Sequence, residues 1–177
     1  MKQLIILIFL LSLAFSELTL AQTTLTKKVF ETGSKTHFDN FKKCDFYFEC
    51  DCCSGKLLFP SSSDFLFVNY CMSDFVVTKG TYMISNGEVT LNFDGKRIDV
   101  KYNWELEMNP NAEPTYFVND STITKYQLNY KIEKCEKTML VNEQENETFI
   151  AIETDLLILG ELEELKKYKL EGLLNLK

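Results

Sequence analysis

The sequence predicts a mainly β protein, an antiparallel up-and-down barrel or sandwich of about eight strands with a short C-terminal helix. Apolar and polar residues alternate with a period of two in several segments, which is typical of strands with one buried face. Tight-turn dipeptides separate these segments, and helical segments do not alternate with them, so parallel βαβ units are not indicated. Aromatic residues make up 13% of the chain and suit pleated, half-buried surfaces.

The N-terminal segment predicts export. Lys2 is followed by the apolar run 4–15, which is short for a membrane span but typical of the apolar centre of a signal peptide. Small-residue cleavage patterns end at Ser16 and at Ala21, and we prefer the second. We therefore expect residues 1–21 to be removed as a signal peptide, with an uncleaved anchor helix as the alternative.

The remaining chain, residues 22–177, is expected to form a single β-rich domain that is secreted or periplasmic. It contains no later apolar run of about 18 residues, so we expect no stable membrane insertion after signal removal. Lysine and arginine number 19 against 26 aspartates and glutamates, which gives a net charge of −7. Nucleic acids and anionic membranes are bound through basic patches, so neither is an expected partner.

The first strands are indicated by alternation and by one strong turn signal. In segment 45–52, phenylalanine and cysteine residues alternate with Tyr47, Glu49 and Asp51. Segment 64–71 is an apolar and aromatic run after a serine-rich turn. Asn86-Gly87 supplies the positive φ angles of a type I′ turn between the strand-like segments 81–85 and 88–94. These features predict a β-hairpin centred on Asn86-Gly87.

A further strand is predicted after a second tight turn at Asp94-Gly95. Apolar residues alternate with polar ones from 98 to 108, which places Trp104 in the core and Glu105 and Glu107 on a solvated face. Paired carboxylates can perform acid–base chemistry or bind a cation, but exposed charge on a sheet face is the more common situation.

The C-terminal half predicts more hairpins and one helix. A loop at 109–114 is followed by a short apolar segment, a turn at Asn119-Asp120 and an alternating series over 122–132. A further strand pair flanks the polar run 142–147. Over 160–170 glutamates precede lysines, which is the polarity that a helix dipole favours, although the spacing of the last leucines leaves a final strand as the alternative.

The six cysteines favour disulfides, because their number is even and thiols of exported proteins are normally oxidised. On an extended strand Cys50 and Cys52 point to one face and Cys53 to the other, so the three do not easily converge on one ion. Neighbouring cysteines rarely bridge each other, so at least two of the three are expected to bond outside the cluster. The disulfide candidates are Cys44, Cys50, Cys52, Cys53, Cys71 and Cys135.

Two other uses of the cysteines stay open. A thiolate metal site would combine Cys50, Cys52 and Cys53 with His37 or Cys44, because soft ligands select copper(I) or zinc. Cys50 and Cys53 also have CxxC spacing, but a dithiol redox motif is expected near a βαβ unit. We therefore assign no metal site from the sequence.

Part of the sequence resembles a known group of barrels. The order CDCCSGKLLF, an aromatic strand and KGTYMISNGEVTLNF, over about residues 50–93, resembles the small lipocalin-like β-barrels of Gram-negative bacterial envelopes, with Gly80 and Tyr82 in their glycine-aromatic strand. It is distantly similar to the N-terminal barrel of copper-resistance-type envelope lipoproteins. The resemblance implies a barrel fold. Because the cysteines read CxCC, and a lipidation cysteine and a GxW signature are absent, it implies no role for individual residues.

Together these observations favour an exported, non-enzymatic β-domain without a cofactor that binds an apolar small molecule or another envelope protein. His37 is the only histidine, and no GxSxG motif accompanies it, so a hydrolase triad is not indicated and we interpret His37 as a surface residue. A thiol-based metal-binding protein and a disulfide-stabilised inhibitor or adhesion module are the alternative functions.

Overall fold

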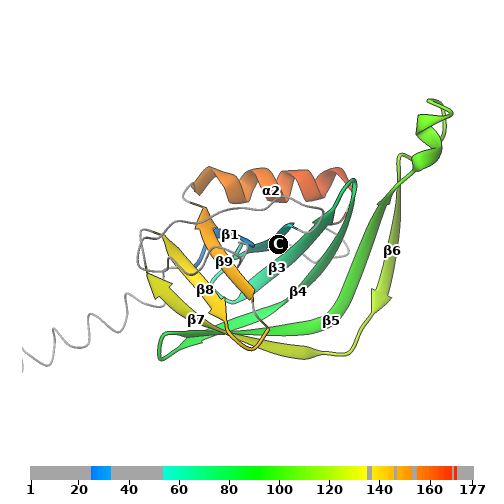
Figure 1. The fold of residues 1–177 in the computed structure, drawn as a ribbon. Coiled ribbons are helices and arrows are strands. Elements are labelled where there is room, and N and C mark those ends of the chain that lie inside the picture. Colours follow the sequence, from blue (N-terminus) through cyan, green and yellow to red (C-terminus); the bar gives the residue numbers. More distant parts are fainter. Residues whose placement is uncertain are drawn as a thin grey trace, which may run out of the picture.

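Eight antiparallel strands close into a barrel in the computed structural model, which describes residues 25–32, 54–134, 137–145, 147–152, 155–168 and 170. Each barrel strand pairs with the next one along the chain, except that β5 pairs with β7 across the intervening β6, and β1 closes the barrel by pairing with β9 (Figure 1). The predicted up-and-down barrel is therefore confirmed, and the sandwich is not adopted. The barrel strands are β1 (Val29–Thr32), β2 (Ser54–Leu58), β3 (Asp64–Cys71), β4 (Asp74–Ser85), β5 (Glu88–Tyr102), β7 (Tyr126–Lys134), β8 (Thr138–Asn142) and β9 (Glu147–Ile152).

The barrel interior is filled by large apolar side chains, because alternate residues of each strand point inwards. Aromatic rings meet edge to face, with centroids 4.8 Å apart for Phe59 and Tyr82 and 4.9 Å apart for Phe65 and Phe93. Leu25, which precedes β1, is completely buried in the same cluster. The described inward-facing residues therefore form a packed core.

A second core lies outside the barrel, between the strands and helix α2 (Asp155–Lys167), which lies across them (Figure 1). Ile158 and Leu165 of α2 are buried against the outward-facing residues of β1 to β5. The predicted C-terminal helix is confirmed, although it begins five residues earlier, at Asp155. Among the described residues, no helix is long and apolar enough to cross a membrane.

The Asn86-Gly87 turn is confirmed. Both residues have positive φ angles, 53° and 78°, and the flanking Ser85 and Glu88 pair directly. The second predicted turn, at Asp94-Gly95, is wrong, because β5 continues through it to Tyr102. Gly95 does have a positive φ of 86°, but it serves a bulge at which the pairing of β5 with β4 changes register.

At this bulge β5 also changes its second neighbour. Residues 88–93 pair with β7, whereas residues 96–102 pair with β6 (Tyr116–Thr122). The predicted turn at Asn119-Asp120 is wrong, because both residues lie inside β6, where Asn119 pairs with Asp99 and Asp120 with Ile98. The outer half of β5 lies between β4, which pairs with its residues 97–100, and β6, which forms the margin of the sheet (Figure 1). We call β6 and this half of β5 the ribbon.

The predicted strand over 98–108 is wrong beyond Tyr102, because the chain turns into a short 3-10 helix, η2 (Trp104–Glu107). Asn103 causes this ending, since its side-chain oxygen caps the helix by accepting a hydrogen bond from the Glu105 backbone. Trp104 is consequently 49% exposed and not in the core. Glu105 and Glu107 are exposed on η2 and do not lie on a strand.

Candidate functional site

The structure does not test the cysteine predictions, and it places one of the six cysteines. Cys71 is exposed at the end of β3, where it pairs with Asp74 across the β3–β4 turn. The predicted strand 45–52 and the other site candidates lie outside the described residues, so the disulfides and the alternative thiolate site stay predictions. These candidates are His37, Cys44, Cys50, Cys52, Cys53 and Cys135. Within the described part of the chain, His, Cys, Asp and Glu side chains form no group of three able to hold a metal ion.

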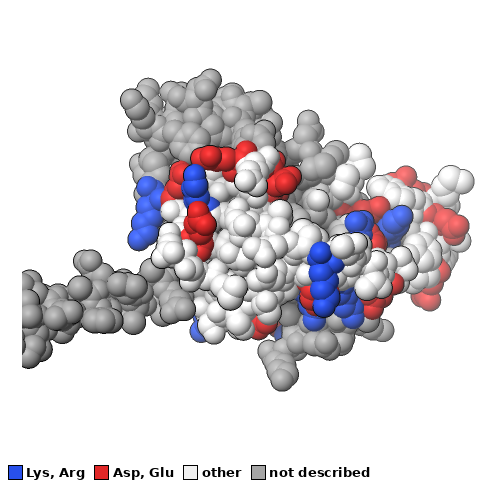
Figure 2. All heavy atoms as spheres, turned by 90° about the horizontal axis from the view of Figure 1, so that it is seen from below, with Lys and Arg blue, Asp and Glu red and all other residues white. Residues whose placement is uncertain are grey.

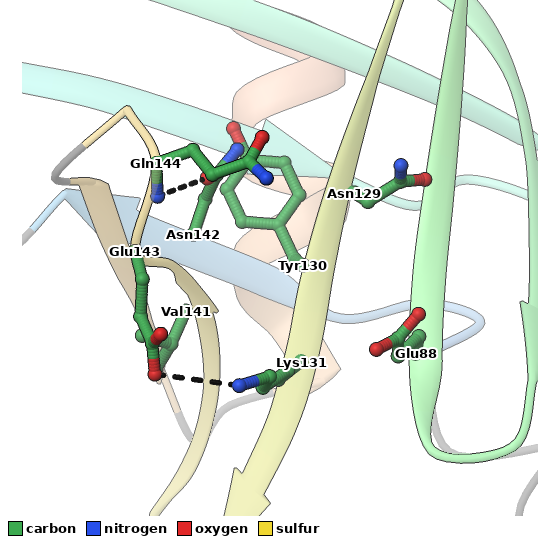
Figure 3. Close-up of a pocket in the computed structure, with 8 residues that line it drawn as sticks. All are labelled: Glu88, Asn129, Tyr130, Lys131, Val141, Asn142, Glu143 and Gln144. Carbon is green, nitrogen blue, oxygen red and sulfur yellow. Dashed lines mark hydrogen bonds and ion pairs between the residues drawn. The ribbon is translucent and has the colours of Figure 1, made fainter.

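A polar hollow opens beside β7 and has a volume of about 270 Å³ (Figure 3). It forms because β8 pairs with β7 only over residues 131–134, so the preceding part of β7 borders the β8–β9 turn without a ladder. Amide and charged side chains predominate in its lining, so its chemistry favours a hydrogen-bonding ligand over an apolar one. The lining residues are Glu88, Asn129, Tyr130, Lys131, Val141, Asn142, Glu143 and Gln144.

One ion pair and two hydrogen bonds position the walls of this hollow. The Lys131 ammonium lies 3.3 Å from a Glu143 carboxylate oxygen and links β7 to the β8–β9 turn. The Asn142 side-chain oxygen accepts backbone hydrogen bonds from Gln144 and Glu145, at 3.0 and 3.1 Å. The turn is therefore held in place by local hydrogen bonds.

Tyr130 connects the hollow to the barrel core. Its ring is 2% exposed and packs edge to face with Phe149, at a centroid distance of 5.7 Å. Its hydroxyl donates a hydrogen bond to the Glu147 carboxylate. Burial, followed by the nearby Glu147 charge, raises the pKa of Tyr130 far above its usual value, so this phenol stays protonated and acts as a structural donor.

The ribbon carries the second candidate site, the outer edge of β6. The Asn103 N–H donates to the Thr115 carbonyl, and the Ile123 N–H donates to the Gly95 carbonyl. Because hydrogen-bonded pairs recur every second residue in an antiparallel ladder, the odd-numbered residues of β6 direct their backbone groups towards β5. The backbone groups of the even-numbered residues therefore point to the other edge: Tyr116, Val118, Asp120 and Thr122.

This edge is open to strand pairing, since no described strand other than β5 pairs with β6. Native proteins usually protect such edges with lysine, proline, bulges or very short strands. β6 has seven residues, contains no proline or lysine, and carries one charge, Asp120, which pairs with Lys96 at 3.3 Å. Within the described residues, the edge of β6 is therefore a template on which another strand could pair.

Several contacts hold the ribbon rigid. The Tyr116 ring packs against Tyr168, which follows α2, at a centroid distance of 4.8 Å, and against Tyr102 of β5 at 5.7 Å. The Tyr102 N–H donates to the Asp74 side chain at 2.8 Å, which ties the ribbon to the β3–β4 turn. The Asn103 amide donates to the Pro114 carbonyl at 2.9 Å. These contacts preorganise the edge and lower the entropy cost of binding.

Apolar side chains are exposed on β6 and in the connection between β5 and β6 that contains η2. The exposed fractions are 51% for Phe117, 43% for Val118, 49% for Trp104 and 92% for Met108. Phe117 and Val118 are neighbours in β6 and lie on its two faces, so both faces present apolar surface beside the open edge. Exposed apolar groups that gather in one region indicate an interaction site.

Comparison with known protein families, curated proteins and solved structures finds no match for this chain. The lipocalin-like resemblance therefore stays a prediction.

Sequence reasoning identified neither candidate site. The hollow depends on how far β8 extends along β7, and the open edge depends on which strands pair with β5. The one signal for the second site is the short apolar segment before Asn119-Asp120, whose aromatic and β-branched residues favour a strand.

Proposed function

We propose that this protein is an exported, non-enzymatic binding domain, and that it binds a protein partner whose strand is added to the open edge of β6. The observation that carries this proposal is the alternation of backbone groups in β6, which leaves four residues with edge-directed N–H and C=O groups. Main-chain hydrogen bonds provide affinity in strand addition, and adjacent side chains provide specificity. Phe117 and Val118 are placed to provide that specificity.

The barrel interior gives less support to the other expected ligand, an apolar small molecule. The side chains that point inwards are large and almost completely buried, and they contact one another across the barrel. A ligand there would have to displace close-packed aromatic groups, which costs packing energy. Strand addition at β6 requires no such displacement.

Strand docking can be tested with a synthetic peptide of residues 115–123, used as a model strand. Binding would be measured by calorimetry and by the fluorescence of Trp104, the only tryptophan in the chain and a neighbour of Tyr102 in the ribbon. We expect Val118→Pro to abolish peptide binding, because proline removes an edge-directed N–H while keeping the ladder to β5.

Matched variants separate docking from folding. Val118→Thr keeps the N–H and the β-branched shape, so it should bind the peptide, whereas Thr122→Pro removes a second edge-directed N–H and should weaken binding. Phe117→Pro removes an N–H that faces β5 and should lower the melting temperature instead. Equal peptide binding by the wild type and by folded Val118→Pro would refute the proposal.

A further inference from the structure

We propose that the strand docked at β6 is β6 of a second copy of this chain, so that the protein forms a twofold-symmetric dimer through its ribbons. The inference rests on the proposed strand docking and names its partner. β6 lies at the margin of the sheet, and no described strand other than β5 pairs with it, so its other edge is the place where a second β6 could pair (Figure 1). An isologous pairing uses the same edge in both copies and ends at two chains.

The backbone N–H and C=O groups that point to the open edge of β6 define how the two β6 strands would align. Full antiparallel overlap of the two seven-residue strands places Asn119 opposite Asn119 of the other copy, at the twofold axis. Tyr116 then pairs with Thr122, and Val118 with Asp120, in both directions. All four edge-directed residues of each copy exchange hydrogen bonds in this register. It also avoids placing the two Asp120 carboxylates directly opposite each other, which would be unfavourable.

The charges along the ribbon favour this antiparallel arrangement. The outer end carries exposed Glu105, Glu107 and Glu113, and Lys101 is the cation closest to them in sequence. At the inner end three cations form ion pairs with carboxylates, Lys79 with Asp94, Lys96 with Asp120 and Arg97 with Asp99, and Lys125 is one additional cation. Figure 2 shows acidic groups gathered towards the far end of the ribbon.

Antiparallel pairing brings the acidic end of each ribbon towards the inner end of the other, where paired charges and Lys125 replace the run of glutamates. Complementary charge guides association and fixes register more than it adds affinity. The net charge of −7 opposes self-association at long range, and salt screens this repulsion as well as the attraction. The aligned backbone groups and the exposed Val118 and Phe117 then supply the contacts at short range.

The test combines sedimentation equilibrium with cysteine cross-linking of the full mature chain. We expect wild-type protein to show a reversible dimer that Val118→Pro abolishes. Asn119→Cys should form a covalent dimer under mild oxidation, because the two Cα atoms would lie about 4.5 Å apart in a non-hydrogen-bonded pair. Wild-type protein, with its own six cysteines, is the background control.

Neighbouring positions make the register falsifiable. Phe117→Cys and Ser121→Cys should each fail to form a disulfide-linked homodimer. In each variant the two introduced cysteines of the dimer lie four residues apart along the strands, which is roughly 13 Å. A mixture of these two variants should form a disulfide-linked heterodimer, because residue 117 of one copy faces residue 121 of the other. Cross-linking at residue 117 that equals cross-linking at 119 would overturn the register.

The dimer measurements test whether the partner is a second copy, whereas the peptide measurements test whether a strand docks at β6 at all. A wild type that stays monomeric at all concentrations, with no Asn119→Cys dimer, would exclude the second copy as the partner. If that monomer still binds the peptide of residues 115–123 and Val118→Pro does not, strand docking stands with a different protein as its partner. Loss of both results would refute the docking site itself.

Discussion

At the residue scale, the backbone of the β4–β5 turn depends on Gly87. Its φ is +78°, a left-handed conformation in which a β-branched side chain is strained, and a Cβ added there would meet no atom within 4 Å. A substitution at Gly87 would therefore lower stability through backbone strain and not through a steric clash. We expect Gly87→Val to destabilise the protein by about 1 kcal/mol or more.

Urea denaturation of Gly87→Val and Gly87→Asn would test this expectation. Asparagine tolerates positive φ angles better than valine, so Gly87→Asn should lose less stability. Equal midpoints for the wild type and Gly87→Val would show that the turn does not need this conformation.

At the element scale, the strands with one buried face were predictable because burial imposes a period of two on the sequence. The same rule failed at Trp104, where the alternation continued past the end of the strand. The side chain of Asn103 decides that ending by capping η2, and local alternation carries no information about the cap. The dipeptide Asp94-Gly95 was misassigned because a tight turn and a bulge require the same positive φ from glycine.

Pairing between distant segments explains the features that could not be predicted. β5 remains one strand through its bulge because β4 runs beside both halves, and Gly80 of β4 permits a very close approach. A Cβ on Gly80 would lie 1.9 Å from the Asn92 carbonyl oxygen. The open edge of β6 and the polar hollow are likewise consequences of strand length and neighbour choice, which a single sequence does not specify.

Helix α2 provides a prediction at the same scale, because its two faces differ in burial. Leu165 is 2% exposed in the outer core, whereas Leu159 of the same helix is 61% exposed. We expect Leu165→Ala to reduce the free energy of unfolding by about 2–5 kcal/mol, through lost burial and a cavity. Leu159→Ala should change it by no more than about 0.5 kcal/mol. Similar denaturation midpoints for the two variants would mean that α2 does not pack on the barrel through this face.

At the scale of the whole molecule, one curved sheet separates two cores, and tyrosines occupy the margins of both. Tyr130 lies between the interior core and the hollow, and Tyr70 donates to Glu161 of α2 at 3.2 Å. Tyr168 joins α2 to the ribbon through Tyr116. Burial is the largest cause of a raised pKa at Tyr70, Tyr130 and Tyr168. Protonated phenols thus contribute to the junctions between barrel, helix and ribbon.

These shifts predict a loss of stability at alkaline pH. Burial, followed by the hydrogen bond with Tyr116, raises the pKa of Tyr168 from 10.0 to about 12. Below pH 10 the phenol is protonated in both the folded and the unfolded chain, so its contribution is fully present. Between pH 10 and 12 the unfolded chain loses this proton more readily than the folded protein, so the free energy of unfolding falls as pH rises.

Urea denaturation across this pH range, combined with tyrosinate absorbance, provides the measurement. We expect absorbance from the buried tyrosines to appear together with the loss of folded structure, and Tyr168→Phe to weaken the dependence of stability on pH between 10 and 12. Because lysines also titrate in this range, the comparison between the variant and the wild type isolates the contribution of Tyr168. Ionisation of every tyrosine near pH 10 in a fully folded protein would contradict the packing of these rings at the junctions.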